Sequence, residues 1–339
     1  MKKSLIALAV ASAFVAPVAM ADVTVYGQAN ASFGSVNDGS NSVMKVSSDS
    51  SRLGFKGSED LGNGTSAIFQ IESLILLDGG TSTLAGRNSY VGLSNAAMGT
   101  VVAGRNDSPY KTATRGLDVF PDTIADNRNM MGVAASVNAF DGRNANSLTY
   151  TSPAMSNVTI AAGYVALNEA KPTNTAVSLA AMYAAGPISA AAAYESHTLD
   201  TVAAGAKESA FKIGGGYTME QFTVNAVYEK TSDSNMTKND HSALYLAGKF
   251  NVSATDAVKA AYTSAGKVGG EANTEATQIS VGYDHMLSKR TTVYALYTSV
   301  SNKSAAMYGL SSNSTGGIAN STGVDKDPNA FVVGMKHSF

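Results

Sequence analysis

Apolar residues recur at every second position along most of this chain after its first twenty or so residues. In the first such segment, Val23, Val25 and Phe33 alternate with polar residues such as Thr24 and Gln28. A period of two puts alternate side chains on opposite faces of a β-strand, so the two faces meet different surroundings. Sixteen segments of this kind can be traced, with predicted starts near residues 23, 51, 65, 87, 99, 147, 158, 176, 188, 210, 221, 243, 257, 275, 291 and 329. The pattern predicts an all-β chain.

The connections between these segments alternate strictly between short and long. The short ones are 60–64, 95–98, 153–157, 186–187, 219–220, 251–256 and 286–289, and the long ones are 35–50, 76–86, 106–146, 167–175, 196–209, 231–242, 265–274 and 302–328. This sorting predicts a 16-stranded antiparallel transmembrane β-barrel with short periplasmic turns and long external loops. Closure leaves no unpaired edge in lipid, and so many strands enclose an aqueous lumen. A soluble sandwich could share the period but has no reason to sort its connections by length.

The composition excludes several classes of protein. Only 15% of the residues are charged, the formal net charge is −2, and there is no cysteine. These values exclude a nucleic-acid binder that relies on a basic patch, a disulfide-stapled domain and a cysteine-ligated metal site. The chain also lacks the Glu, Lys and Leu richness of a coiled coil. No metal or cofactor motif is found, so we predict no cofactor.

The first 21 residues have the anatomy of a secretory signal peptide. Lys2 and Lys3 precede an apolar stretch, and Ala19-Met20-Ala21 forms a small-x-small cleavage site. We expect cleavage between Ala21 and Asp22, which leaves residues 22–339 as the barrel domain. The alternative is an N-terminal membrane anchor, but the apolar stretch is shorter than the roughly 20 residues that a spanning helix needs.

Aromatic residues on the apolar face gather beside the short turns and the C-terminus. They are Tyr217, Phe222, Phe250, Tyr283 and Phe339. Such positions suit an aromatic girdle at the periplasmic interface of a membrane barrel. The alternative explanation is that aromatic residues simply favour strands.

The longest connection, 106–146, contains 41 residues and is unusually apolar for an external loop. Its apolar members are Pro109, Leu117, Phe120, Ile124, Met130, Met131 and Phe140. Loops of this length are usually functional or disordered, and apolar side chains favour a packed loop. We therefore expect this segment to fold into the barrel and narrow the lumen.

Several motifs, in this order and at barrel spacing, carry a family resemblance. They lie at residues 22–27 (DVTVYG), 51–57 (SRLGFKG), 59–64 (EDLGNG), 87–93 (RNSYVGL), 104–105 (GR), 146–153 (NSLTYTSP), 281–291 (VGYDHMLSKRT) and 333–339 (VGMKHSF). Across the whole mature chain the sequence resembles the general trimeric porins of Gram-negative outer membranes, especially those of β- and γ-proteobacteria. The resemblance implies a homotrimer that lets ions and small hydrophilic solutes diffuse passively across the outer membrane.

The resemblance also implies a set of pore residues. The third loop forms the constriction, a basic ladder corresponds to Arg52, Arg87 and Arg143 with Lys56 and Arg105 beside it, and the acidic partners on the loop correspond to Asp118, Asp122 and Asp126. Alternation independently supports Arg52 and Lys56, because both lie opposite the apolar face. Opposed basic and acidic walls would set up a transverse field across the lumen. We expect weak selectivity, in which an anion preference at the neck competes with the net negative charge of the mature chain. The alternative for each charge is a solvated position on a rim. The loop lacks the Pro-Glu-Phe-Gly run of the enterobacterial relatives.

The same resemblance implies partners in assembly and in the membrane, and other functions of the same barrel have to be compared with diffusion. Phe339 matches the C-terminal signal read by the barrel-assembly machinery, and outer-membrane lipid and lipopolysaccharide would surround the barrel. An adhesin or a substrate-specific channel could use the same barrel. An enzyme is disfavoured, because none of the four histidines lies in a nucleophile-elbow, metal-binding or phosphate-binding motif.

Overall fold

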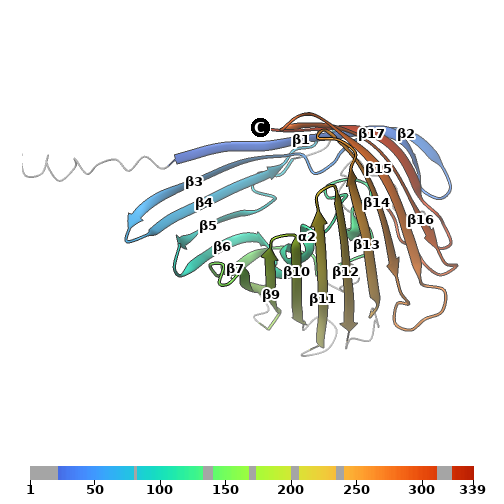
Figure 1. Ribbon diagram of the computed structural model, residues 1–339. Coiled ribbons are helices and arrows are strands. Elements are labelled where there is room, and N and C mark those ends of the chain that lie inside the picture. Colours follow the sequence, from blue (N-terminus) through green and yellow to red (C-terminus); the bar gives the residue numbers. More distant parts are fainter. Residues whose placement is uncertain are drawn as a thin grey trace, which may run out of the picture.

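The computed structural model describes residues 22–79, 82–132, 140–167, 173–199, 206–233, 240–310 and 323–339. The predicted signal peptide, including Ala21, lies outside the described residues, and Asp22 is the first residue of strand β1. Almost every described element is a strand in one antiparallel sheet (Figure 1). Among these residues, no helix is both long enough and apolar enough to cross a membrane.

The strands follow one another around the sheet in chain order. Their bounds are β1 (Asp22–Asn37), β2 (Ser42–Ser48), β3 (Arg52–Gly62), β4 (Thr65–Leu74), β5 (Ser89–Asn95), β6 (Gly99–Asp107), β7 (Arg143–Thr151), β8 (Val158–Ala166), β9 (Thr175–Ala185), β10 (Ile188–Leu199), β11 (Ala206–Met219), β12 (Phe222–Asp233), β13 (Ser242–Asn251), β14 (Asp256–Ala265), β15 (Ala276–Ser288), β16 (Thr291–Asn302) and β17 (Asn329–Ser338). Two short helices, α2 (Pro109–Arg115) and η1 (Asn127–Asn129), lie between β6 and β7.

The sheet closes on itself because β1 pairs with β17 along one side. On its other side β1 pairs with β2 over its second half and with β3 over its first half. The segments β2 and β3 are therefore two parts of one wall strand, interrupted at residues 49–51. The wall thus consists of sixteen strands in the described part of the chain, which confirms the predicted barrel.

The C-terminal residue takes part in this closure. Backbone hydrogen bonds join Gly27 and Phe339 in both directions, with N···O distances of 3.0 and 3.1 Å. The Phe339 ring lies where a side chain at position 27 would begin, because a Cβ added to Gly27 would come within 2.4 Å of the ring. A glycine at this position therefore lets the terminal aromatic ring pack against the barrel seam.

Most strand starts lie within two residues of the predicted positions, and three regions need correction. Residues 35–50 were expected to form a loop, but they contain the end of β1 and all of β2, which pair around a turn at 38–41. Strands β7 and β11 each begin four residues earlier than predicted, at Arg143 and Ala206. In all three regions polar or charged residues interrupt the alternation of apolar residues, although the backbone still pairs with the neighbouring strands.

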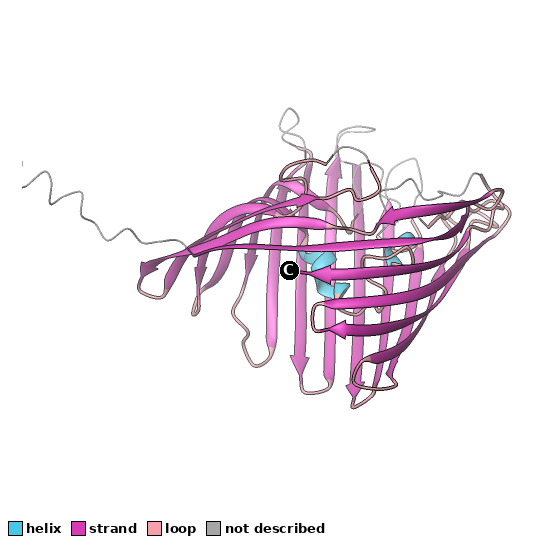
Figure 2. Cartoon of the chain, turned by 90° about the horizontal axis from the view of Figure 1, so that it is seen from above, coloured by secondary structure: helices cyan, strands magenta, loops and turns pink. Residues whose placement is uncertain are grey.

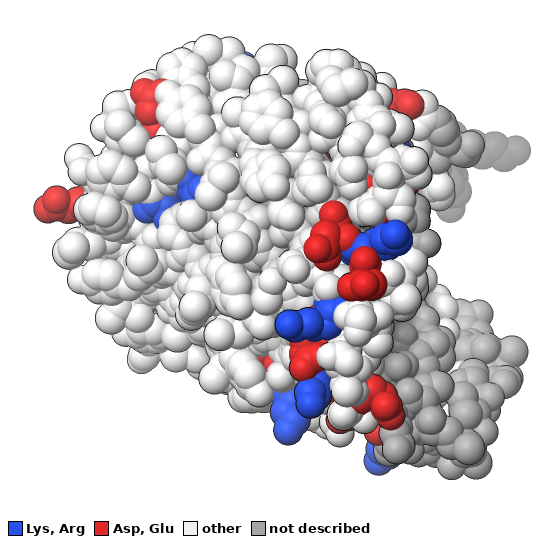
Figure 3. Space-filling model, turned by 90° about the vertical axis from the view of Figure 1, so that its right-hand side faces the viewer, with Lys and Arg blue, Asp and Glu red and all other residues white. Residues whose placement is uncertain are grey.

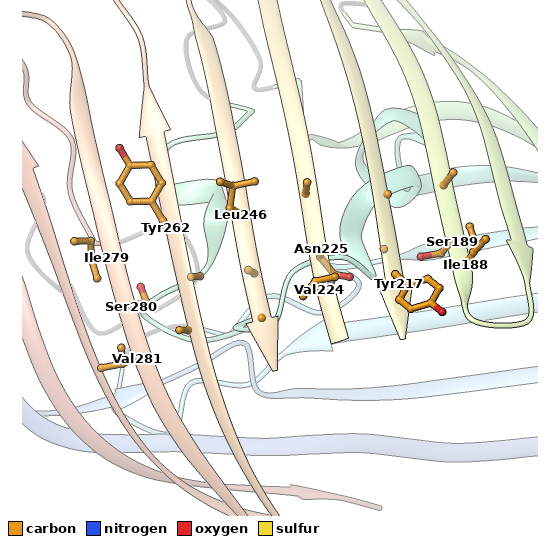
Figure 4. A pocket seen from close by; sticks show the side chains of 18 residues that line it. Ile188, Ser189, Tyr217, Val224, Asn225, Leu246, Tyr262, Ile279, Ser280 and Val281 are labelled. Atoms are coloured by element: carbon orange, nitrogen blue, oxygen red, sulfur yellow. The ribbon is translucent and has the colours of Figure 1, made fainter. Parts of the chain in front are cut away.

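The outer face of the wall is apolar over a wide area. Large side chains that face outward on β10 to β15 are exposed and surround positions held by Ala and Gly; in Figure 4 they are Ile188, Tyr217, Val224, Leu246, Tyr262, Ile279 and Val281. Another side of the molecule is also largely without charge over its centre, with most of its Lys, Arg, Asp and Glu toward one edge and a few near the opposite edge (Figure 3). Of the predicted girdle residues, Tyr217, Phe222, Tyr283 and Phe339 are exposed. An outer face of this kind suits contact with hydrocarbon.

Candidate pore constriction

The described part of the connection between β6 and β7, residues 108–132 and 140–142, lies inside the barrel. Figure 2 shows its helix within the ring of strands. The apolar residues that singled out this segment are buried, and the side chains of Phe120 and Met130 have no exposed surface. They pack with apolar residues that point inward from the wall, such as Val227 and Leu296. The prediction of an inward-folded loop is confirmed.

Inward-facing glycines on the wall make room for two of these apolar side chains. A Cβ added to Gly214 would come within 2.6 Å of the Leu117 side chain, and one added to Gly282 would come within 2.8 Å of the Phe120 ring. Any larger residue at either position would displace the loop. The wall and the loop are therefore complementary in shape at Leu117 and Phe120, which fixes the loop's depth in the lumen.

A buried charged cluster anchors both ends of the loop to the wall. The Lys212 ammonium on β11 lies 2.7 Å from a carboxylate oxygen of Asp141 and 3.2 Å from one of Glu229. Glu229 also accepts hydrogen bonds from the Tyr110 hydroxyl at 2.8 Å and from the Gly132 backbone at 2.7 Å. We call these five residues the loop anchor. Because the Lys212 and Glu229 side chains are at most 2% exposed, the anchor depends on complete pairing.

The loop begins with a short capped helix that points two cationic side chains into the lumen. The Ser108 hydroxyl accepts a hydrogen bond from the Lys111 backbone N–H, and Pro109 occupies the first turn, which is a common way to start a helix. Lys111 and Arg115 are four residues apart, so they share one face of α2. That face turns toward β3 to β7 of the wall, as their shared cavity lining shows.

Arg115 forms ion pairs with all three aspartates of the loop. Its guanidinium lies 3.3 Å from Asp118, 3.2 Å from Asp122 and 2.6 Å from Asp126. Arg128 also pairs with Asp126, at 3.0 Å. The Asp118 and Asp126 side chains have no exposed surface. These two carboxylates therefore hold the loop's own fold together.

The pKa values of the two buried carboxyl groups, Asp118 and Asp126, are shifted in opposite directions. Burial and the neighbouring Asp126 raise the pKa of Asp118 to about 6, although Arg115 opposes the rise. Burial acts to raise the pKa of Asp126 as well, but Arg115 and Arg128 outweigh it and hold that pKa below its usual range. Asp126 is thus the charged centre of the loop, between two guanidinium groups.

The wall opposite the loop carries the predicted arginines, each with a carboxylate partner. Arg52 on β3 lies 3.0 Å from Asp122 of the loop, Arg143 on β7 lies 3.1 Å from Asp107 on β6, and Arg87 pairs with Glu72 on β4. Asp107 also pairs with Lys111, at 2.8 Å. Basic and acidic groups are therefore mixed on the wall.

Wall and loop enclose a cavity of about 300 Å³, which we call the arginine cavity. Its charged lining residues are Arg52, Arg87, Lys111, Arg115, Arg128, Arg143, Glu72, Asp107 and Asp122. Six of these are cationic and three acidic. This differs from the expected pair of opposed walls, because loop and wall each contribute both signs and the excess charge is positive on both.

Three comparisons with known proteins bear on this geometry. A family model described as Gram-negative porin matches residues 7–305. Outer membrane porin protein 32 of Delftia acidovorans is 29% identical over the full length of both chains. Major outer membrane protein P.IB of Neisseria gonorrhoeae is 43% identical over 120 residues, which are 33% of this chain and 34% of that protein.

Solved structures show the same fold. The anion-selective porin from Comamonas acidovorans superposes with a TM-score of 0.81 at 24% identity, covering 94% of this chain and all of that one. OmpF of Salmonella typhi, solved with daunomycin, gives 0.73 at 18% identity, covering 94% and 97%. The chain belongs to the Gram-negative porin family. This porin is an outer-membrane β-barrel that forms a channel for passive diffusion of ions and small hydrophilic solutes.

Of the predicted ladder residues of this porin, three line the arginine cavity and two do not. Arg52, Arg87 and Arg143 line it, whereas Lys56 is exposed with its ammonium 5.3 Å from the centre of the Tyr26 ring. Arg105 is directed to the backbone oxygen of Gly86, 3.0 Å away. Alternation predicts Lys56 on the inward face, but a strand's inward residues are spread along the whole lumen and only some reach its narrowest part.

Among the predicted acidic residues, only Asp122 lines the cavity, and five other charged residues were missed. The missed residues are Glu72, Asp107, Lys111, Arg115 and Arg128. Lys111 and Arg115 could have been found by their helical spacing after the Ser-Pro pair, since that pair is typical of a helix start. No sequence pattern marked Glu72 and Asp107 as pore residues, because their role depends on pairing with Arg87 and Arg143, which the fold brings next to them.

Proposed function

We propose that this porin prefers anions and that the arginine cavity sets the preference. The supporting observation is the excess of six cationic over three acidic side chains around a space of about 300 Å³. Each lining carboxylate lies within 3.2 Å of a cationic group, and the buried Asp118 and Asp126 also pair with Arg115 and Arg128. Six cationic side chains therefore stand against five carboxylates, which leaves a small positive excess. The Comamonas porin, described as anion-selective, shares the fold.

The mixed lining supports weak rather than absolute selectivity. Two unit charges 4 Å apart in water interact by only about 1 kcal/mol, and ion pairing reduces the net field further. We assign the preference mainly to Arg52, Arg87 and Arg143 of the wall together with Lys111, Arg115 and Arg128 of the loop. The negative charge of Asp122 reduces the anion preference, whereas Asp118 and Asp126 stabilise the fold of the loop.

The remaining partners are proposals of the same kind. A homotrimer is supported by the Vibrio cholerae OmpT structure, whose description names a trimer form and whose TM-score is 0.71. We further propose removal of residues 1–21 on export, recognition of Phe339 by the barrel-assembly machinery, and contact of the apolar outer face with lipid and lipopolysaccharide. The family match supports a channel without catalytic activity.

Planar-bilayer recording tests the proposed preference directly. Purified full-length porin should insert as steady ohmic steps, and a potassium chloride gradient should give a reversal potential of the sign that chloride permeation requires. A reversal potential of the cation sign would contradict anion preference while leaving the channel itself intact. Liposomes that do not swell with small sugars would contradict passive diffusion.

Lys111 gives this preference a pH dependence. Burial, together with Arg128 and Arg143, lowers the pKa of Lys111 to about 8 against the opposing effect of Asp107. Raising the pH from 7 to 9 removes most of the Lys111 charge, so the anion preference should fall over that interval. No histidine lines the cavity in the described part of the chain. The variant Lys111→Arg should keep its charge and give a reversal potential that does not change between pH 7 and 9.

A further inference from the structure

A second cavity lies on the other side of the constriction loop and is rich in lysine. Its volume is about 310 Å³, and it is enclosed by loop residues such as Phe120 and by the inner faces of strands β12 to β17. Lys249, Lys259 and Lys336 line it. We call it the lysine cavity. None of its lysines lines the arginine cavity.

The lysine cavity lies toward the periplasmic rim. Lys249 is two residues before the end of β13, Lys259 is three residues after the start of β14, and Lys336 is two residues before the end of β17. All three ends are at the short turns or the C-terminus. Arg143, in contrast, starts β7 at the long-loop end. The lysine cavity therefore lies nearer the periplasmic rim than Arg143 does.

The lysines are close together and only partly compensated. Lys249 and Lys259 are direct cross-strand partners, an arrangement in which like charges destabilise the sheet. Lys259 has one carboxylate partner, Asp284, at 2.8 Å. In the described part of the structure neither Lys249 nor Lys336 forms an ion pair. Two positive charges in this cavity thus lack a carboxylate partner.

The other carboxylate of the lining, Asp118, does not supply that compensation. It pairs with Arg115 at 3.3 Å and accepts hydrogen bonds from the Tyr245 hydroxyl and the Phe120 backbone, each at 2.9 Å. Because its side chain has no exposed surface, it is turned away from any solute in the cavity.

The loop holds one of the lysines in a fixed position. The Lys259 ammonium lies 4.8 Å from the centre of the Phe120 ring, and Phe120 is itself seated over Gly282. A cation over an aromatic face is stabilised in place. Lys249 and Lys336 flank this fixed point, so the cavity presents ammonium groups from three different strands.

We propose that the lysine cavity is a binding site for small dianions. Its two uncompensated charges match a dianion, and its volume lies at the small end of ligand pockets. Two carboxylates on a short chain can each meet an ammonium group, and charge-assisted hydrogen bonds of this kind are strong. This inference rests on the proposed anion preference, since a dianion must enter the lumen to bind.

Succinate block of chloride current tests the proposal. With wild-type porin, succinate should reduce the unitary chloride conductance in a saturable manner, and butyrate, a monoanion of equal chain length, should do so only at much higher concentration. The double variant Lys249→Gln/Lys336→Gln should raise the half-blocking succinate concentration by about tenfold or more for the loss of two charged hydrogen-bond donors. Lys249→Arg/Lys336→Arg should retain the block.

Two matched variants separate this site from its surroundings. Lys289→Gln removes an exposed lysine from the same rim and should leave the block unchanged. Arg52→Ser/Arg87→Ser alters the arginine cavity and should leave a succinate block that still depends on Lys249 and Lys336. A block of equal strength in wild type and in the Lys249→Gln/Lys336→Gln variant, or no block of an open wild-type channel, would overturn the proposal without affecting channel function. Absence of any channel would instead refute the proposed function.

Discussion

Replacing Arg52 and Arg87 together by serine should largely remove the anion preference of this porin. The variant reduces the cationic lining of the arginine cavity from six residues to four, against three carboxylates. It also leaves Glu72 without its partner Arg87, and Asp122 with Arg115 alone. If each charge contributes about 1 kcal/mol, the anion-to-cation permeability ratio should fall roughly fivefold for each arginine. The reversal potential in a potassium chloride gradient measures this change.

Two control variants isolate the role of these charges. Arg52→Lys/Arg87→Lys keeps the charge and should retain most of the preference, losing only the guanidinium geometry. Lys56→Gln removes a basic residue on the same strand as Arg52 but outside the cavity, and it should leave the reversal potential unchanged. An unchanged reversal potential in the double serine variant would refute the assignment of selectivity to the wall arginines.

Replacing Lys212 by methionine should release the constriction loop from the wall. The substitution leaves Asp141 and Glu229 buried next to each other without their shared cation. Breaking a buried ion pair by removing one partner costs about 3–5 kcal/mol. Much of this cost can be relieved if Tyr110 and Gly132 leave Glu229 and the loop moves away. We therefore expect a larger and noisier unitary conductance, and faster liposome swelling with sugars that the wild type admits slowly.

The matched control is Lys230→Met, on the neighbouring strand. Lys230 directly opposes Phe211 on β11 but points outward and is exposed, so its replacement should leave conductance and swelling unchanged. Both variants should keep the heat-modifiable migration of a folded barrel, because the wall hydrogen bonds do not involve these side chains. A Lys212→Met channel with wild-type conductance would show that the apolar contacts of Leu117 and Phe120 alone hold the loop.

Alternation and connection length were enough to predict the barrel and most of its strands. Each strand repeats the same physical requirement, apolar side chains toward lipid and polar side chains toward water, so an error in one strand does not affect the others. The prediction failed at β2 because its alternation is irregular. Val43 and Met44 are adjacent and the segment is flanked by Ser and Asn, so the composition resembles that of a loop even though the backbone pairs with β1.

The pore was less predictable than the wall. The inward loop could be inferred, since Leu117 and Phe120 need burial and a barrel of this width offers it only in the lumen. The direction of its charged groups could not be inferred. Asp118 and Asp126 were expected to face the lumen, but Arg115 holds both in the interior of the loop. Nothing in their spacing shows which carboxylate pairs with which cation.

The sequence by itself thus determined the closed barrel, its orientation and the segment that narrows it, because these depend on local periodicity and on chain length between strands. Only the tertiary structure decided the content of the two cavities. Arg52 pairs with Asp122, and Lys249 and Lys336 line one cavity, although the residues of each pair are far apart in the chain. Electrostatic interactions depend on distance and burial, which closure of the barrel sets and which no local pattern records.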